Sequence, residues 1–224
     1  MTTLITPPAP LKPTAPAPAA APSPTFPSAP GWPPLYRFTV EQYHAMIEAG
    51  IVPEDNQHEF ILGLVVRKMS KNPAHCFAQE RLGERLPLLV APLWRVRSQD
   101  PIALADGEPE PDQSVYPASV NTGLRHPRGD EVALVVEVAD STLNTDRNAK
   151  KVQYASALIP VYWIVNIPDR QVEVYTGPSG PGASPDYATR ADHGLGDSVP
   201  VAIMGAEVGR IPVADLFPQP GGTP

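Results

Sequence analysis

The sequence predicts one mixed β-sheet with helices on its faces, an α/β or α+β domain. The first reason is the order of the local patterns along the chain: helix, hairpin, helix, a run of strands, helix, and a further hairpin. The second reason is size, because 224 residues of which 42% are apolar can enclose one sizeable core. The third is a sharp change in composition near residue 35, which separates a proline-rich start from the patterned remainder.

The proline-rich start is predicted to be a disordered tail. Residues 1–34 contain 12 of the 31 prolines and a single charged side chain, Lys12. Such a segment cannot build a core, so it is expected to be partly polyproline II and to act as a linker. Binding to a partner with a proline-reading groove is the alternative. The folded domain is expected over residues 35–217, and residues 218–224 are predicted to be a flexible C-terminal tail.

The first two predicted elements of the domain are a capped helix and a hairpin. A helix is predicted to begin after Thr39, which forms a capping-box pattern with Gln42, and to end at Gly50. Residues 58–70 contain two apolar stretches joined at Gly63, which is typical of a β-hairpin.

A second helix is predicted from Asn72, the N-cap, and Pro73, the first helical residue, to about Leu89. Pro87 lies where it could kink this helix. The later elements are read from apolar alternation and from turn residues. They are strands at 94–99, 112–117 and 131–139, a helix at 141–158 with Ser141 or Thr142 near its cap, a hairpin at 161–176 turning at Pro168 and Asp169, and short closing strands up to residue 217.

One charged side chain interrupts the apolar strand at 131–139. Alternate residues of a strand share a face, so the bulky residues are expected to face the core and Glu137 to lie on the other side among small residues. The core side holds Val132, Leu134, Val136 and Val138, and the other holds Glu131, Ala133, Val135, Glu137 and Ala139. An edge strand with Glu137 in solvent, or a salt bridge to an arginine, would also explain this carboxylate.

Asp112, at the start of the preceding strand, provides a candidate partner for Glu137. If the two strands are adjacent the carboxylates converge, and a cation such as magnesium would offset their repulsion. Lys150, in the following helix, could stabilise the charge of a phosphate under attack. The alternative is that Lys150 and Lys151 are surface lysines, with Asp146 and Lys150 forming an ordinary i,i+4 pair.

Charge and composition restrict the class of protein. A net charge of −7 argues against a protein that holds DNA on a broad basic surface. The single cysteine, Cys76, excludes an intramolecular disulfide and is typical of a reducing cytoplasm. The N-terminus lacks the basic and apolar regions of a signal peptide, and no apolar run is long enough for a membrane helix. We therefore expect a cytoplasmic protein.

Several motifs between about Phe38 and Tyr175 resemble the Uma-two family of the PD-(D/E)xK, restriction-endonuclease-like superfamily. They are FTVEQYHAMIEAG, HEFILGLVVRKMS, RVRSQDPIAL, EPEPDQSV, LVVEVADST, DRNAKKVQYASALIPVYWIVNI and QVEVYTG. The resemblance implies a restriction-endonuclease-like mixed sheet flanked by helices. It also implies an endonuclease that hydrolyses DNA with magnesium or manganese.

The resemblance also assigns roles to individual residues. Asp112 and Glu137 match the metal-binding carboxylates, and the carbonyl of Val138 would be a further metal ligand. The superfamily usually places its catalytic lysine two residues after the glutamate, where this chain has Ala139. In the Uma-two pattern the lysine lies in the next helix, where Lys150 aligns.

Three further residues are additional candidates. Glu59 matches the acidic residue that opens the family's first hairpin and could contact a second metal or a water, and Tyr154 lies one turn after Lys150. His75 is placed either at the edge of the site or in a structural role. The resemblance also makes a homodimer an expectation by analogy. A non-catalytic binding or scaffold protein that retains the fold, and a metal-dependent hydrolase of RNA or another phosphate ester, are the alternative functions.

Overall fold

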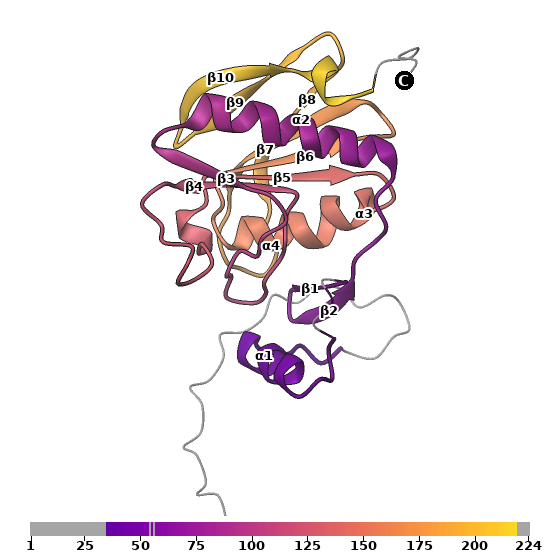
Figure 1. Ribbon diagram of the computed structural model, residues 1–224, viewed down its shortest axis with the longest axis vertical. Coiled ribbons are helices and arrows are strands. Elements are labelled where there is room, and N and C mark those ends of the chain that lie inside the picture. Colours follow the sequence, from indigo (N-terminus) through magenta and orange to yellow (C-terminus); the bar gives the residue numbers. More distant parts are fainter. Residues whose placement is uncertain (1–34, 54, 56, 219–224) are drawn as a thin grey trace, which may run out of the picture.

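The computed structural model describes residues 35–53, 55 and 57–218 (Figure 1). Residues 1–34 and 219–224, for which tails are predicted, lie outside the described residues. A six-stranded sheet with the order β3-β4-β5-β6-β7-β8 forms the centre, and only β5 and β6 are parallel neighbours. The strands are β3 (Trp94–Arg97), β4 (Gln113–Pro117), β5 (Leu134–Ala139), β6 (Val161–Asn166), β7 (Gln171–Pro178) and β8 (Tyr187–His193). The predicted mixed sheet is thereby confirmed.

A helical crossover connects the parallel strands β5 and β6, as a parallel pair requires. It consists of α3 (Leu143–Thr145), one π-helical turn, η2 (Asp146–Lys150), and α4 (Lys151–Ser156). The helix predicted at 141–158 is confirmed, but its π turn was not predicted. Thr142 holds the N-cap position without a side-chain capping hydrogen bond.

The long helix α2 (Pro73–Val90) covers the opposite face of the sheet (Figure 1). The N-cap prediction is confirmed, since Oδ1 of Asn72 accepts a hydrogen bond from the His75 backbone N–H at 2.9 Å. Pro87 lies inside the helix, which continues beyond it to Val90. Its apolar stripe packs on the sheet together with a hairpin and a terminal 3-10 turn. These are β9 (Ser198–Ile203), β10 (Ala206–Pro212) and η3 (Val213–Leu216).

Both faces of β5 are buried, so the prediction that only its bulky side faces a core was incomplete. Leu134, Val136 and Val138 join the core under α2, whereas Val135 and Ala139 pack in a second core beneath the crossover. The strand is also shorter than predicted.

The residue that should have opened this strand, Glu131, belongs instead to a 3-10 turn, η1 (Gly129–Glu131). Its carboxylate accepts hydrogen bonds from the guanidinium of Arg125 and from the backbone N–H of Arg128. These local bonds fold the backbone into a turn before the ladder of β5 begins.

The N-terminal elements form a small layer beside the crossover (Figure 1). They are α1 (Val40–Glu48), β1 (His58–Ile61) and β2 (Leu64–Arg67). The predicted capping box at Thr39 and the predicted hairpin are both confirmed. Gly63 has φ of 75° in the hairpin turn, a conformation that glycine adopts readily.

The hairpin is joined to the rest of the fold by backbone hydrogen bonds. The N–H of Glu108 donates to the carbonyl of Phe60 at 2.7 Å, and the N–H of Gly63 donates to the carbonyl of Asp106 at 2.7 Å. The ring of Phe60 stacks on Tyr43 of α1 with centroids 4.5 Å apart. This arrangement fixes the position of Glu59, the neighbour of Phe60.

None of the helices in the described part of the chain is long and apolar enough to span a membrane.

Candidate active site

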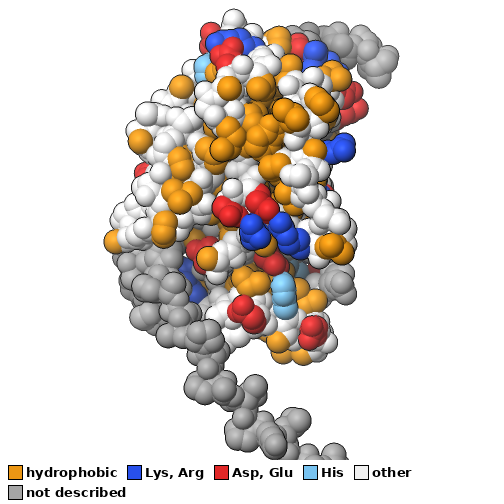
Figure 2. All heavy atoms as spheres, turned by 90° about the vertical axis from the view of Figure 1, so that its left-hand side faces the viewer, with side chains coloured by type: hydrophobic (Ala, Val, Ile, Leu, Met, Phe, Trp, Pro, Cys, Tyr) orange, Lys and Arg blue, Asp and Glu red, His pale blue; other side chains and the backbone are white. Residues whose placement is uncertain are grey.

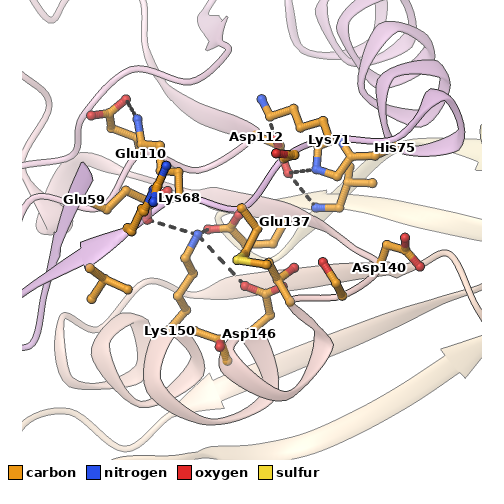
Figure 3. A pocket seen from close by; sticks show the side chains of 18 of the residues that line it. Glu59, Lys68, Lys71, His75, Glu110, Asp112, Glu137, Asp140, Asp146 and Lys150 are labelled. Atoms are coloured by element: carbon orange, nitrogen blue, oxygen red, sulfur yellow. Dashed lines mark hydrogen bonds and ion pairs between the residues drawn. The ribbon is translucent and has the colours of Figure 1, made fainter. Parts of the chain in front are cut away.

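A groove of about 510 Å³ lies between the β1–β2 hairpin, the start of α2 and the loop that follows β5 (Figure 3). It contains most of the residues that the sequence singled out. Glu59, His75, Asp112, Glu137, Val138 and Lys150 line it. Tyr154 lies behind the groove and contacts it through Glu137.

Asp112 lies next to β5 because β4 and β5 are antiparallel neighbours, with Gln113 opposite Val136. The two strands are therefore adjacent, which was the condition for pairing Asp112 with Glu137. Oδ2 of Asp112 accepts a hydrogen bond from the backbone N–H of Val138 at 2.8 Å and lies 3.2 Å from Nε2 of His75. Burial alone would raise the pKa of Asp112, but these contacts and the charge of Lys150 outweigh it and lower the pKa.

Glu137 lies on a central strand and is 4% exposed, so the alternative of an edge strand in solvent is wrong. Its Oε1 accepts hydrogen bonds from Nζ of Lys150 at 3.0 Å and from the hydroxyl of Tyr154 at 2.7 Å. The alternative of an arginine partner is wrong as well. Strand alternation directs this carboxylate toward the crossover, where Lys150 and Tyr154 reside.

Lys150 is buried, so it is not the surface lysine of the alternative interpretation. Its ammonium lies 3.2 Å from Glu59, 3.0 Å from Glu137 and 3.9 Å from Asp146 (Figure 3). Lys151 pairs instead with Asp186 at 2.8 Å, outside the groove. Consecutive helical residues are rotated by about 100°, which separates the two lysines.

Burial and the charges of their neighbours shift the pKa values of the buried groups in the site. Burial opposes the charged form of Lys150, but Glu137, Glu59, Asp146 and Asp112 outweigh it and raise its pKa well above the usual value. Burial and the neighbouring carboxylates act to raise the pKa of Glu137, whereas the ammonium of Lys150, 3.0 Å away, acts to lower it. Burial raises the pKa of Asp146 to about 6. An additional cation would relieve this excess of carboxylates.

Sequence reasoning missed the roles of Asp146 and Lys71. Asp146 is 1% exposed and faces Lys150, and its i,i+4 spacing was visible but was considered only as a surface pair. Lys71 lines the groove with Nζ 3.7 Å from Oδ1 of Asp112. Its position immediately before the N-cap Asn72 was the available signal, because that position places its side chain beside the start of α2.

The donor set suits magnesium better than a metal held entirely by protein ligands. Among residues 35–53, 55 and 57–218, no three His, Cys, Asp or Glu side chains gather as a metal site. Asp112 and Glu137 supply two carboxylates, and magnesium commonly uses only one or two, together with waters and substrate phosphates. The donors to Glu137 both reach Oε1, so Oε2 faces no described hydrogen-bond donor. Asp112 and Glu137 are therefore the residues that would hold a magnesium ion, with waters or substrate as the remaining ligands.

Comparison with known proteins identifies the family. A solved chain described as "a putative nuclease belonging to DUF820 from Anabaena variabilis ATCC 29413" has the same fold, with a TM-score of 0.58 and 17% identity. The similarity covers 77% of this chain and 96% of that one. No curated protein sequence matches. The model of the Uma2 family, described as "Putative restriction endonuclease", matches residues 40–208, and the chain therefore belongs to the Uma2 family.

Proposed function

We propose that this protein is a metal-dependent DNA endonuclease that hydrolyses phosphodiester bonds. The observation that carries the proposal is the buried contact between Lys150 and Glu137 in a groove that also holds Asp112. One carboxylate on β5 and one directly before β4, beside a lysine, offer the two functions that phosphodiester hydrolysis needs, a cation site and a positive charge near the phosphate. The matched family and the similar solved chain are both described as nucleases, which supports this class of reaction.

Asp112, Glu137 and the carbonyl of Val138 would hold the magnesium or manganese ion. When bound, such an ion polarises the phosphate and supplies a water of lowered pKa. The proposal is supported by the two buried carboxylates and by the excess of negative charge around Lys150. Glu59 lies on the far side of Lys150 from β5 and would contribute through that lysine or through a water.

The chain's own residues have separate tasks in this proposal. Lys150 orients the attacking water and offsets the charge that develops on the phosphate oxygens. Tyr154 holds Glu137 in place through its hydroxyl, and His75 does the same for Asp112. Attack of water on phosphorus with departure of the 3′ oxygen would leave a 5′-phosphate end.

The direct test is DNA cleavage by the purified chain with magnesium, manganese or EDTA. Asp112→Ala and Lys150→Ala should each reduce the rate at least about 100-fold, the scale of a lost transition-state contact. Lys151→Ala is the matched control, since this neighbouring lysine lies outside the groove and should retain the parent rate. Mapping the products should give 5′-phosphate ends.

A chain that cuts no form of DNA with either metal would contradict the proposal. Cutting by Asp112→Ala and Lys150→Ala at the parent rate would contradict the assigned site. Circular dichroism of each variant separates loss of chemistry from loss of folding.

A further inference from the structure

We infer that the groove accepts an unpaired segment of DNA, such as a strand end, a flap or a single strand, in preference to an intact duplex. This inference rests on the proposed function and adds the class of substrate. It follows from the size of the groove, the depth of its acidic floor, and the placement of charge around it.

The groove has the size of a site for one small molecule. Its volume of about 510 Å³ lies within the range of roughly 300–1,000 Å³ that is typical of pockets for drug-sized ligands. One nucleotide, or a nucleotide with part of its neighbour, is a ligand of that size. A duplex presents two paired strands and would have to place one phosphate in the groove while the other strand remained outside.

The proposed catalytic groups lie at the bottom of the groove. A phosphate within an intact duplex reaches that depth less readily than a phosphate of a single strand. Asp112, Glu137 and Lys150 are all buried, with residue exposures of 6%, 4% and 8%. The β1–β2 hairpin forms one wall and the start of α2 forms another. A single strand can enter such a site without its complement, whereas enzymes that act inside a duplex first extrude the target nucleotide at a cost of a few kcal/mol.

Charge around the groove is also unlike that of a duplex-binding surface. Arg67, Lys68 and Lys71 line the walls, but Glu110 and Asp140 line them as well, and Lys68 is paired with Glu110 at 2.6 Å. Away from the groove, on the side of the molecule that Figure 2 shows, Lys and Arg side chains also lie beside Asp and Glu in small groups. Duplex binding depends on several neutralised phosphates, and the chain's net charge of −7 opposes it.

Two groove residues have the chemistry to hold an unpaired nucleotide. Lys71 is partly exposed, and its ammonium lies 3.7 Å from Oδ1 of Asp112, where it can contact a phosphate that approaches this carboxylate. Met69 is 61% exposed, although it is apolar and lines the groove. Its thioether can pack against the face of a base, a contact that a base stacked within a duplex does not offer.

The test measures binding and cleavage of three labelled DNAs of one sequence: a single strand, its perfect duplex, and the duplex with a single-stranded flap. Binding is measured by fluorescence anisotropy in EDTA at fixed salt, so it does not depend on cleavage. We expect the single strand and the flap to bind at least about tenfold more tightly than the duplex, with cuts mapping to unpaired nucleotides. Equal or tighter binding of the duplex, or equal cutting of it, overturns the inference.

Matched variants localise the effect to the groove. Met69→Ala should weaken single-strand binding about two- to tenfold, the range of one sulfur–aromatic contact, whereas Met204→Ala should leave it unchanged. Met204 is similarly exposed, at 69%, but lies in the turn between β9 and β10. Lys71→Ala should weaken binding and Lys151→Ala should not. Equal effects of the paired variants would overturn the assignment to this groove.

The two proposals fail separately. Tight single-strand binding without cleavage would support the substrate class and contradict the nuclease activity. Efficient cleavage of intact duplex would support the activity and contradict the substrate class.

Discussion

Nζ of Lys150 lies 3.0 Å from Oε1 of Glu137, and both side chains are buried. The pair joins the centre of the sheet to the helical crossover, since Glu137 belongs to β5 and Lys150 to the π turn η2. A charge held at this depth is tolerated only while its partner is present. The contact is therefore important for folding as well as for the proposed chemistry.

Replacing Lys150 with methionine should destabilise the fold by about 3–5 kcal/mol, because it leaves buried carboxylates without their cation. Lys151→Met should cost at most about 1 kcal/mol, since its partner Asp186 has a side chain that is 59% exposed to solvent. Urea unfolding at pH 7 measures both. The double variant Lys150→Met with Glu137→Gln should recover part of the lost free energy of unfolding. Equal losses for Lys150→Met and Lys151→Met would contradict the claim that the buried contact of Lys150 stabilises the fold more than the Lys151 pair does.

Tyr154→Phe should cost about 1.5–3 kcal/mol, the range for a hydrogen bond to a charged group, because the hydroxyl donates to Glu137 at 2.7 Å. Tyr187→Phe is the comparison, since that buried hydroxyl donates to the neutral carbonyl of Ile159 at 2.9 Å and should cost about 0.5–1.5 kcal/mol. Thermal unfolding of both variants gives the ranking. A smaller cost for Tyr154→Phe than for Tyr187→Phe would mean that Glu137 is not charged in the fold.

Periodicity predicted the sheet and its carboxylate pair well. Alternation in β5 placed Glu137 opposite the bulky residues, and the pairing of β4 with β5 brings Asp112 beside that strand. These relationships depend on short-range pattern and on strand pairing, which the sequence expresses directly. Capping at Thr39 and Asn72 was predictable for the same reason.

Features set by distant contacts were not predictable. Asp146 has the spacing of a surface pair, and only the packing of the crossover on the sheet buries it. The π turn at 146–150 carries no sequence signal of its own. Lys71 reaches Asp112 because the start of α2 lies beside β4, a tertiary relationship that local patterns do not contain.

The ion pair between Glu131 and Arg125 should make stability depend on pH in the acid range. The side-chain hydrogen bond from Arg125 lowers the pKa of Glu131 from 4.5 to about 2. A carboxyl with a depressed pKa stabilises the fold above its unfolded pKa, and that contribution is lost as the pH falls from about 4.5 to about 2. Glu131→Gln should therefore lower stability at pH 7 and flatten the dependence in that window.

Urea unfolding from pH 2 to pH 7 measures this dependence. Asp130→Asn is the control, since this neighbouring carboxylate is largely exposed. This substitution should leave the change in free energy of unfolding between about pH 2 and pH 4.5 nearly as in the parent. If the free energy of unfolding of Glu131→Gln falls with decreasing pH as steeply as that of the parent, the ion pair of Glu131 with Arg125 is not the source of the pH dependence.

Gly107 controls how the β1–β2 hairpin is seated beside the groove. A Cβ at this position would lie 2.4 Å from the carbonyl oxygen of Phe60 and 2.2 Å from Nε2 of Gln153, so the hairpin would have to move. Gly107→Ala should therefore destabilise the fold by about 1–3 kcal/mol, the usual cost of overpacking. It should also loosen the contact of Glu59 with Lys150, because Glu59 directly precedes Phe60.

Gly182→Ala is the matched control, since a Cβ there meets nothing within 4 Å. It should leave stability unchanged or raise it by up to about 1 kcal/mol, because alanine restricts the unfolded chain. Hydrogen exchange of the β1 amides, measured alongside thermal unfolding, reports on the hairpin itself. Unchanged exchange in Gly107→Ala would mean that the hairpin does not depend on this close approach, and that Glu59 is held by Lys150 alone.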